Sequence, residues 1–357
     1  MKRILQISMT KIIGGIESFQ RNLFSHIDRA EYPFDFVTTY QDAALIPTVE
    51  ALGGRVHHLP PQKTVIPYCI ALYRLLKREN YHAVHIHKNS CANPMAIFVS
   101  RLAGVKQIIV HSHSTAAIGG RHLHIFHYLF RPLVRRIATV RLACSQEAGR
   151  WLFGKNCDFT VIKNGIDTVR FSYNDENRRK YREELNLEGK LVIGHVGNFI
   201  HAKNHGFMIE IMAEVLKKQP DAVLMLVGRG DGRPAIEAYA RQKGIADQVI
   251  FMGARNDVAE LYSAMDVFLF PSLFEGLPIA GVEAQCADLP CLFSEGVSLQ
   301  TILTDKAQRI PLDKGAAYWA EKVLECKDGS RGDVTEVLWE KGFDAGITAA
   351  FMEKVYG

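Results

Sequence analysis

The sequence predicts an α/β fold with two facing Rossmann-like domains and an interdomain cleft. Three observations lead to this prediction. Short β-type runs alternate with amphipathic segments of helical length along the whole chain, a pattern typical of parallel sheets covered by helices. The alternation restarts after a polar stretch near the middle of the chain. The length of 357 residues also suits two domains of about 100–200 residues each.

The first half contains the expected strands of one parallel sheet, each a short apolar run bounded by polar or turn-forming residues. They are Arg3–Ser8, Phe34–Thr39, Arg55–Leu59, Ala83–His87, Gln107–His111, Arg141–Cys144 and Phe159–Lys163. Amphipathic segments such as Ser18–Ile27 and Ile70–Arg78 lie between them and predict helices. We therefore expect a first Rossmann-like domain over residues 1–170.

The second half repeats this organisation. Its expected strands are Leu191–Val196, Ala222–Val227, Gln248–Met252, Asp266–Phe270 and Leu289–Phe293, and its expected helices lie near Gly206–Lys218, Pro234–Gly244, Asp257–Met265 and Ile279–Ala287. The polar stretch Ser172–Gly189 is the expected linker. We expect a second domain over residues 171–357 and leave open whether its last helix packs back on the first domain.

Composition and charge narrow the class of protein. Apolar residues make up 48% and charged residues 23%, which is a globular composition. Residues 1–170 hold 22 basic and 10 acidic side chains, a net charge of +12, whereas the remainder has a net charge of −7. A basic half suits nucleic acid, an anionic membrane surface or an acidic substrate. We do not expect nucleic acid, because no RNP, zinc-finger or basic-zipper pattern accompanies the charge.

The expected location is the cytoplasm. No apolar run is long enough to span a bilayer, and the apolar stretch after Met1 is too short for a signal-peptide core. The seven cysteines form no C-x-x-C pair and no zinc-type cluster with histidine, so we expect reduced thiols and no metal site. Peripheral contact with the inner face of the plasma membrane stays open.

The strongest motif has two glutamates, Glu275 and Glu283, with seven residues between them, the first in a glycine-containing loop and the second about one turn into a helix. Both can face the cleft, where the loop presents backbone N–H groups and a helix amino terminus to an anionic or hydroxyl-rich ligand. Carboxylates accept hydrogen bonds from vicinal hydroxyls. The alternative is a helix-start acid and a solvated helix residue.

The segment Phe274–Pro290, FEGLPIAGVEAQCADLP, resembles the E-x7-E signature of retaining glycosyltransferases of the GT-B fold, in the large family 4 that holds bacterial capsule and exopolysaccharide transferases. Other segments resemble that family's motifs in the expected order. These are the glycine loop Gly14-Gly15-Ile16-Glu17, the H-S-H segment around His113, the N-G-x-D at Asn164–Asp167, the phosphate-binding strand and loop from Gly194 to His205, and the glycine turn Val227–Gly230.

The resemblance implies a donor, an acceptor and a mechanism. The second domain would bind a nucleotide diphosphate-sugar, expected to be a UDP-sugar, and the first would bind a glycan or polyprenyl-diphosphate-linked acceptor. Glu283 would hold the ribose hydroxyls, and Glu275 with Gly276, Leu277 and Pro278 would hold the transferred sugar. The resemblance suggests a front-face substitution in which the leaving phosphate helps to deprotonate the acceptor. No cofactor and no essential metal ion are implied.

Lys203 and the Gly14–Gly15 loop are the expected partners of the diphosphate. The leaving group develops negative charge, and Lys203, after the strand Leu191–Val196, is placed to stabilise it, although an exposed loop lysine is the alternative. The family usually has a second cation immediately after the V-G pair, where this sequence has Asn198. An asparagine donates hydrogen bonds but carries no charge, so activation of the leaving group is weaker, shifted to Arg229 or another basic residue, or lost.

His113 and Arg255 are further candidates. His111 and His113 alternate at the end of the strand Gln107–His111, so both point the same way, and the resemblance favours His113 as a contact to sugar or acceptor hydroxyls. A satisfied structural histidine is the alternative. Arg255, after Gly253-Ala254, resembles the region that cradles the nucleotide base, although surface arginines are common.

The stretch Arg121–Arg141 is both basic and rich in aromatic residues. A helix of this composition can lie on an anionic bilayer, and the net charge of the first half favours that interpretation. Core packing with the arginines extended to solvent is the alternative.

Two other classes of protein stay open. Asn198 is compatible with a non-catalytic GT-B homologue that binds a nucleotide sugar or a partner transferase, although both glutamates are present. A Rossmann-type oxidoreductase is disfavoured, because the glycine spacing after the first strand is not G-x-G-x-x-G.

Overall fold

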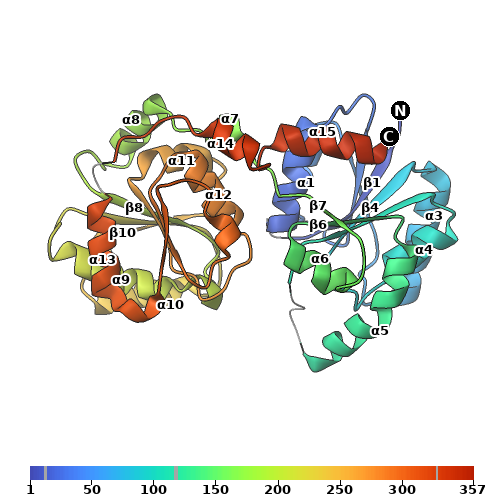
Figure 1. Cartoon of the computed structure of the whole chain (residues 1–357), viewed down its shortest axis with the longest axis horizontal. Coiled ribbons are helices and arrows are strands. Elements are labelled where there is room, and N and C mark those ends of the chain that lie inside the picture. Colours follow the sequence, from blue (N-terminus) through green and yellow to red (C-terminus); the bar gives the residue numbers. More distant parts are fainter. Residues whose placement is uncertain (12–13, 116–119, 327–328) are drawn as a thin grey trace. The chain divides into compact units, whose positions relative to one another are not determined.

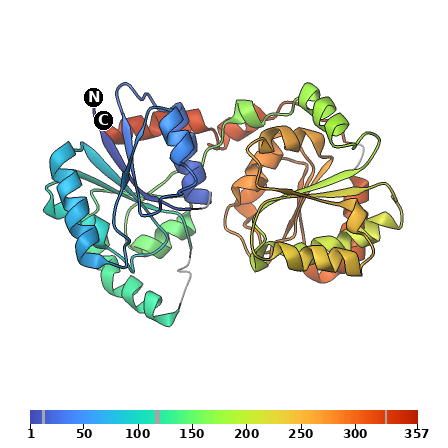
Figure 2. The same cartoon turned by 180° about the vertical axis from the view of Figure 1, so that it is seen from behind.

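The computed structural model describes residues 1–11, 14–115, 120–326 and 329–357, and the chain divides into two compact units. Unit 1 comprises residues 1–165 and 342–357, and unit 2 comprises residues 166–341. Each is a parallel sheet with helices on both faces (Figures 1 and 2). The units differ from the expected domains at two places, since unit 1 ends five residues before 170 and includes the last helix of the chain.

In the described part of unit 1, the sheet has seven parallel strands in the order β3-β2-β1-β4-β5-β6-β7. The strands are β1 (Ile4–Met9), β2 (Phe34–Thr38), β3 (Arg55–His58), β4 (Ala83–Lys88), β5 (Gln107–Ser112), β6 (Val140–Ala143) and β7 (Thr160–Val161). The helices are α1 (Gly15–His26), α2 (Ile46–Ala51), α3 (Val65–Glu79), α4 (Met95–Leu102), α5 (Arg121–Ile137), α6 (Gln146–Phe153) and α15 (Ala345–Tyr356).

In the described part of unit 2, the sheet has six parallel strands in the order β10-β9-β8-β11-β12-β13. The strands are β8 (Val192–Val196), β9 (Val223–Val227), β10 (Val249–Gly253), β11 (Val267–Phe270), β12 (Cys291–Ser294) and β13 (Ala307–Ile310). The helices are α7 (Thr168–Phe171), α8 (Asp175–Glu184), α9 (His205–Leu216), α10 (Arg233–Gln242), α11 (Val258–Ala264), α12 (Ile279–Cys286), α13 (Gly315–Glu325) and α14 (Thr335–Glu340). Short 3₁₀ turns are η1 (His201–Lys203), η2 (Ala246–Gln248), η3 (Leu299–Thr301) and η4 (Leu312–Lys314).

The apolar strands form the middle layer of each unit because both of their faces are covered. In unit 1, one core cluster joins the sheet to α3, α4, α5 and α6, and a second joins the opposite face to α1 and α15. In unit 2, a core cluster joins the sheet to α9 and α13. Each strand order reverses once, between β1 and β4 in unit 1 and between β8 and β11 in unit 2. Such switch points are where open α/β sheets bind ligands.

The prediction that Ser172–Gly189 is a linker was wrong. Within this stretch α8 forms a helix of unit 2 that packs on α11. Asn174 caps it by accepting a hydrogen bond from the Asn177 N–H at 2.8 Å. Arg178 and Arg182 both pair with Asp266, at 2.6 and 3.2 Å. Charge pairing therefore fixes a helix whose composition is too polar to show an apolar stripe.

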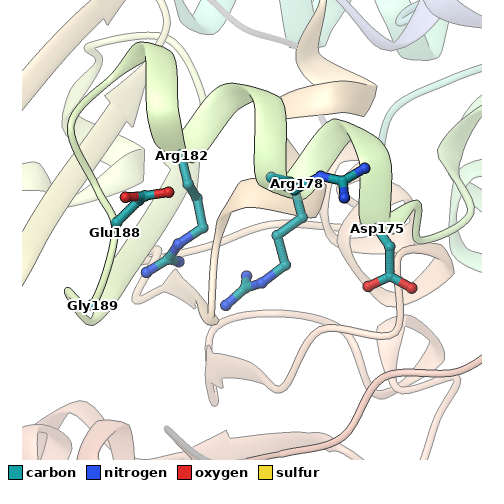
Figure 3. Close-up of a pocket in the computed structure, with 6 residues that line it drawn as sticks. Asp175, Arg178, Arg182, Glu188 and Gly189 are labelled. Carbon is teal, nitrogen blue, oxygen red and sulfur yellow. The ribbon is translucent and has the colours of Figure 1, made fainter.

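Figure 3 shows a hollow of about 410 Å³ beside this helix, and two of the arginines that line it, Arg178 and Arg182, pair with Asp266. It is lined by Asp175, Arg178, Arg179, Arg182, Glu188 and Gly189. Elsewhere, no helix in the described ranges is long and apolar enough to cross a membrane.

Candidate functional site

The switch point of unit 2 brings together the ends of β8 and β11, and both carry candidate residues. The loop after β11 is fixed by backbone bonds: the Glu275 N–H donates to the Gly296 carbonyl at 2.9 Å, and Glu275 bridges to Val297. A Cβ on Gly296 would lie 2.2 Å from the carbonyl oxygen of Leu273, so only glycine allows this close approach. The position of Glu275 is therefore set by the loop after β12.

Lys203 and Glu275 form an ion pair. Lys203 Nζ lies 2.6 Å from Glu275 Oε1, and the side chains are only 14% and 22% exposed. The same ammonium lies 4.4 Å from the centre of the Phe270 ring, a cation–π distance. Lys203 comes from η1 and Phe270 is the last residue of β11, so the pair joins the two strands of the switch point.

Glu283 lies on α12 and is 8% exposed. Tyr262 of α11 donates from its hydroxyl, with Oη 3.1 Å from Glu283 Oε2. Burial and this carboxylate raise the pKa of Tyr262 well above its usual range, so the phenol keeps its proton and remains a donor. Sequence reasoning missed Tyr262, because a tyrosine on an amphipathic helix gives no signal beyond core packing.

The residues between the two glutamates open α12. Pro278 is its buried N-cap residue, Leu277 is half-buried and Gly276 is exposed. A Cβ on Gly276 would meet no atom within 4 Å, so packing gives no reason for a glycine at this position. Close approach of a ligand to the backbone is a sufficient reason.

Two glycines bring the ends of β8 and β9 into contact. Gly228 has φ +153°, and a Cβ there would lie 2.0 Å from the carbonyl oxygen of Gly197. Asn198, the next residue, is half-buried, and within the described ranges its side chain makes no hydrogen bond. Arg229 is exposed, and its carbonyl accepts from the Phe199 N–H at 2.9 Å.

Arg255 lies apart from this group, in the loop that follows β10. It makes a bidentate pair with Asp257, with distances of 2.8 and 2.5 Å, and Tyr181 donates to the same carboxylate at 2.8 Å. The charge of Arg255 is therefore offset locally, and the structure adds nothing in favour of a base contact.

In unit 1, Gly14 caps α1 and Gly15 is its first residue. Glu17, which is buried, accepts from the Thr10 N–H, the Thr10 hydroxyl and the Gly14 N–H at 3.0, 2.7 and 3.1 Å. This carboxylate ties Thr10 to the N-cap of α1. A Cβ on Gly15 would meet no atom within 4 Å, so the amino terminus of α1 is open at that residue.

His113 follows β5 and is half-buried, whereas His111 is fully buried, so only one of the two reaches the edge of the sheet. Their rings do lie on the same side, with centres 4.0 Å apart. His113 Nε2 lies 2.9 Å from His87 Nδ1. Burial lowers the pKa of His113 to about 3, so the ring is neutral at physiological pH.

A hollow of about 670 Å³ lies between α5 and α6 of unit 1. Basic and aromatic side chains make up much of its wall: Tyr128, Arg131, Arg135, Arg150, Trp151 and Lys155, together with Glu147. The same helix, α5, exposes four apolar or aromatic side chains by 44–66%: Tyr128 of this wall and, nearby along the helix, Ile125, Phe126 and Leu129. Core packing therefore does not account for this face of the helix.

With its two Rossmann-like units, the chain has the GT-B fold. Residues 13–170 match the family model described as Glycosyltransferase Family 4, and residues 177–330 match the model described as Glycosyl transferases group 1. The chain belongs to this family of enzymes.

Particular relatives cover almost the whole chain. The Bacillus subtilis protein that carries the name glycosyltransferase EpsF is 30% identical over 99% of this chain and 96% of its own length. An Escherichia coli UDP-Gal:α-D-GlcNAc-diphosphoundecaprenol α-1,3-galactosyltransferase is 25% identical over 82% of this chain and 79% of its own. Anabaena HepE, solved with UDP and glucose, has the same fold with a TM-score of 0.81, 18% identity and 99% coverage of both chains.

Proposed function

We propose that this glycosyltransferase moves a sugar, with retention of anomeric configuration, from a UDP-sugar to a glycan or polyprenyl-diphosphate-linked acceptor in capsule or exopolysaccharide synthesis. The observation that carries the proposal is the Lys203–Glu275 ion pair at the switch point of unit 2. The pair places a cation, which can bind a diphosphate, next to a carboxylate, which can bind sugar hydroxyls. The names of the B. subtilis and E. coli relatives support the polysaccharide role and the lipid-linked acceptor.

Unit 2 binds the donor in this proposal. Glu283 accepts from the two ribose hydroxyls, beside the hydrogen bond that it accepts from Tyr262. Glu275 and the backbone of Gly276, Leu277 and Pro278 hold the transferred sugar. Lys203 holds the diphosphate, and Asn198 and Arg229 at the ends of β8 and β9 donate to its oxygens. The crystallised relative bound to UDP and glucose supports UDP as the nucleotide.

The chemistry follows from the charges at this site. When the bond between sugar and diphosphate breaks, the leaving group gains negative charge, and the ammonium of Lys203 stabilises it. The acceptor hydroxyl attacks from the side that the diphosphate leaves, and a phosphate oxygen takes its proton. Configuration is retained without a covalent enzyme intermediate, so no side-chain nucleophile is needed.

Unit 1 binds the acceptor. His113 lies at the carboxyl edge of its sheet, where it contacts sugar or acceptor hydroxyls. The Gly14–Gly15 loop lies at the same edge and, with Lys203, contacts the diphosphate of the donor. The basic hollow between α5 and α6 takes the diphosphate of a lipid-linked acceptor, because four cations face one carboxylate there. The exposed apolar side chains of α5 then contact the anionic inner face of the plasma membrane.

A non-catalytic homologue that binds a nucleotide sugar or a partner transferase is the second candidate, and Asn198 is the observation that favours it. A donor panel separates the two. The purified chain is incubated with UDP-, GDP- and ADP-sugars and a lipid-linked acceptor extract, and release of nucleoside diphosphate is measured. We expect acceptor-dependent release from a UDP-sugar. Binding of UDP without turnover of any donor would favour the non-catalytic homologue.

A further inference from the structure

In unit 1, a buried polar network lies between one face of the sheet and helices α1 and α15. Four histidines alternate along two paired strands, His85 and His87 on β4 and His111 and His113 around the end of β5. Alternation places all four on one face of the sheet. Gln6 of β1 and Tyr356 of α15 complete the network, and both are at most 1% exposed.

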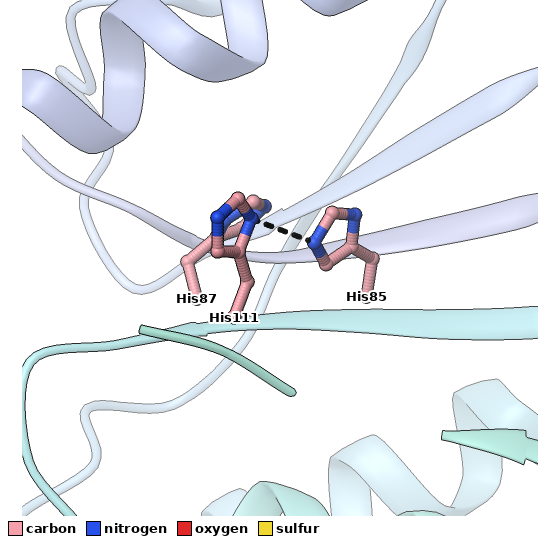
Figure 4. Close-up of side chains that lie close together, drawn as sticks. All are labelled: His85, His87 and His111. Carbon is pink, nitrogen blue, oxygen red and sulfur yellow. Dashed lines mark hydrogen bonds between the residues drawn. The ribbon is translucent and has the colours of Figure 1, made fainter. Parts of the chain in front are cut away.

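The hydrogen bonds form one continuous chain. Gln6 Nε2 donates to Tyr356 Oη at 3.1 Å, and Gln6 Oε1 lies 2.9 Å from His87 Nε2. His87 Nδ1 lies 2.9 Å from His113 Nε2. On the other branch, Tyr356 Oη lies 2.8 Å from His85 Nδ1. His85 Nε2 lies 3.3 Å from His111 Nδ1, the contact drawn as a dashed line in Figure 4.

Every ring in the network is neutral. Burial lowers the pKa of His113 to about 3 and those of His85, His87 and His111 well below the usual value. A neutral imidazole carries one N–H and one lone pair. The tautomer of each ring is therefore fixed by its neighbours.

The amide of Gln6 sets the direction. Its oxygen only accepts, so His87 Nε2 must carry the hydrogen and His87 Nδ1 has the lone pair. His113 Nε2 must then donate to His87, which leaves His113 Nδ1 with a lone pair. On the other branch Tyr356 accepts from Gln6 and donates to His85 Nδ1, so His85 Nε2 donates to His111 Nδ1.

Two nitrogens of the network, His113 Nδ1 and His111 Nε2, have no hydrogen-bond partner in the described part of the chain, and both atoms are buried. His111 Nε2 ends one branch inside the core, where the Phe19 ring lies perpendicular to the His111 ring with centres 4.8 Å apart. His113 Nδ1 ends the other branch at the edge of the sheet, on the ring that sequence and family resemblance single out.

We propose that Gln6 and Tyr356 are positioning residues that hold His113 in the Nε2–H tautomer, so that His113 Nδ1, which is buried in the free protein, keeps a lone pair for a substrate hydroxyl that uncovers it on binding. Helix α15 thus influences His113 through Tyr356 and Gln6, which do not themselves contact substrate in this proposal. This inference rests on the proposed function for the identity of the hydroxyl, but the tautomer is a property of the protein alone.

A metal ion is the competing use of the same cluster. His85, His87 and His111 offer ligand atoms that lie within 4.8 Å of one another (Figure 4). The group contains no carboxylate, and a divalent cation there would displace the bonds to Tyr356, Gln6 and His113 that these rings already make. Burying that charge without an anion is unfavourable. The hydrogen-bond chain therefore accounts better for the cluster.

The first test reads the tautomer directly. The full chain is labelled with ¹⁵N-histidine, the His113 ring is assigned by comparison with His113→Gln, and two-bond ¹H–¹⁵N spectra distinguish protonated from unprotonated nitrogens. We expect His113 to carry its hydrogen on Nε2 in the wild type, with Nδ1–H appearing in Tyr356→Phe, because the amide of Gln6 is then free to turn. An Nδ1–H tautomer in the wild type overturns the proposal, as does a His113 signal unchanged in Tyr356→Phe.

The second test measures kcat/KM and UDP affinity in variants of His113 and Tyr356. Asparagine places its amide near the Nδ1 position of histidine and glutamine near the Nε2 position, so His113→Asn keeps an acceptor that His113→Gln loses. We expect kcat/KM to fall about tenfold in His113→Gln and about three- to tenfold in Tyr356→Phe, the scale of one hydrogen bond. His113→Asn should recover part of the loss, and UDP affinity should stay unchanged throughout.

His82→Asn is the matched control, because the asparagine amide does not reach the Nε2 position. His82 Nε2 lies 2.8 Å from the carbonyl oxygen of Tyr356, so the variant loosens the same helix end without touching the network. Wild-type kcat/KM in this variant supports the proposal, and a loss equal to that of Tyr356→Phe overturns it, since docking of α15 alone would then be the cause. If no donor is turned over by the wild type, the proposed function fails while the spectra still decide the tautomer.

Discussion

Lys203 Nζ lies 2.6 Å from Glu275 Oε1, although the two residues are expected to contact different parts of the donor. A Cβ on Gly197 would lie 2.7 Å from His195 Nε2 and 3.2 Å from Lys203 Cε, so the glycine leaves room for both side chains. The carboxylate keeps the ammonium at the end of β11 beside Phe270. A bound diphosphate would share the ammonium with Glu275 or replace it as partner.

The first prediction concerns this pair. Lys203→Ala should lower kcat by about two to three decades, the scale for one preorganised electrostatic group. Lys203→Arg keeps the charge and should retain more activity. A double-mutant cycle with Glu275→Gln should be strongly non-additive, because each single change leaves the other charge half-buried and unpaired. Near-normal turnover in Lys203→Ala would show that the charge comes from elsewhere, with Arg229 the first candidate.

The second prediction concerns Asn198, the position where the family resemblance leads us to expect a second cation. Asn198→Arg adds a charge beside the end of β8, so turnover should be unchanged or increased, provided that the longer side chain does not displace the donor sugar. Steady-state kinetics with one donor and one acceptor measure this, and Asn198→Leu, of similar size but without hydrogen-bonding groups, is the control. If the leucine variant is as active as wild type, Asn198 makes no contact with the diphosphate.

The third prediction concerns the membrane. Binding to vesicles with anionic lipid should fall steeply with salt, since the screening length is about 8 Å at 0.15 M. Changing Arg131, Arg135 and Arg136 to Glu should abolish cosedimentation. The matched control changes the same number of exposed basic residues on α3 and α4, namely Arg74, Lys77 and Arg101. Binding that survives the α5 changes, or falls equally in the control, would place the contact elsewhere.

The fourth prediction concerns acid stability. Burial lowers the folded-state pKa of His113 to about 3 and of His205 to about 4, and those of His85, His87, His111 and His195 well below the usual value. The unfolded chain, with histidine pKa values of about 6.5, binds more protons below that pH. Stability should therefore fall as pH falls from about 6.5, by up to about 1.4 kcal/mol per pH unit for each buried histidine.

Urea denaturation at a series of pH values between about 7 and 4 measures that slope. His111→Asn removes one of the buried rings and should reduce the slope by about one proton. A free energy of unfolding that does not change over this range would mean that the histidines are protonated in the folded protein.

The sequence predicted the strands well where they are apolar throughout, as in Val223–Val227, because a short continuous apolar run is typical of a parallel strand that is buried on both faces. It missed β13, whose sequence AQRI is buried only at its ends, as an edge strand allows. It also missed α8, because salt bridges to Asp266 rather than an apolar stripe hold that helix.

At the site, motifs identified single residues but not their partners. Lys203 and Glu275 were each expected from local sequence, whereas their contact depends on how β8 and β11 pair in the sheet. Tyr262 gave no signal for its bond to Glu283. The buried network of unit 1 does have a sequence signal. Histidines at alternate positions of two successive strands, AVHIHK and IIVHSH, predict a shared polar face.

Glu283 gives the most direct test of the donor site, through calorimetric titration of UDP. Glu283→Ala should weaken UDP binding about tenfold or more, since a carboxylate that accepts from hydroxyls contributes roughly 1.5–3 kcal/mol. Tyr262→Phe keeps the Glu283 carboxylate and removes only the hydroxyl that donates to it, so the affinity of this variant for UDP should stay close to wild type. An unchanged dissociation constant in Glu283→Ala, or a wild-type chain that does not bind UDP, would contradict the donor site described for unit 2.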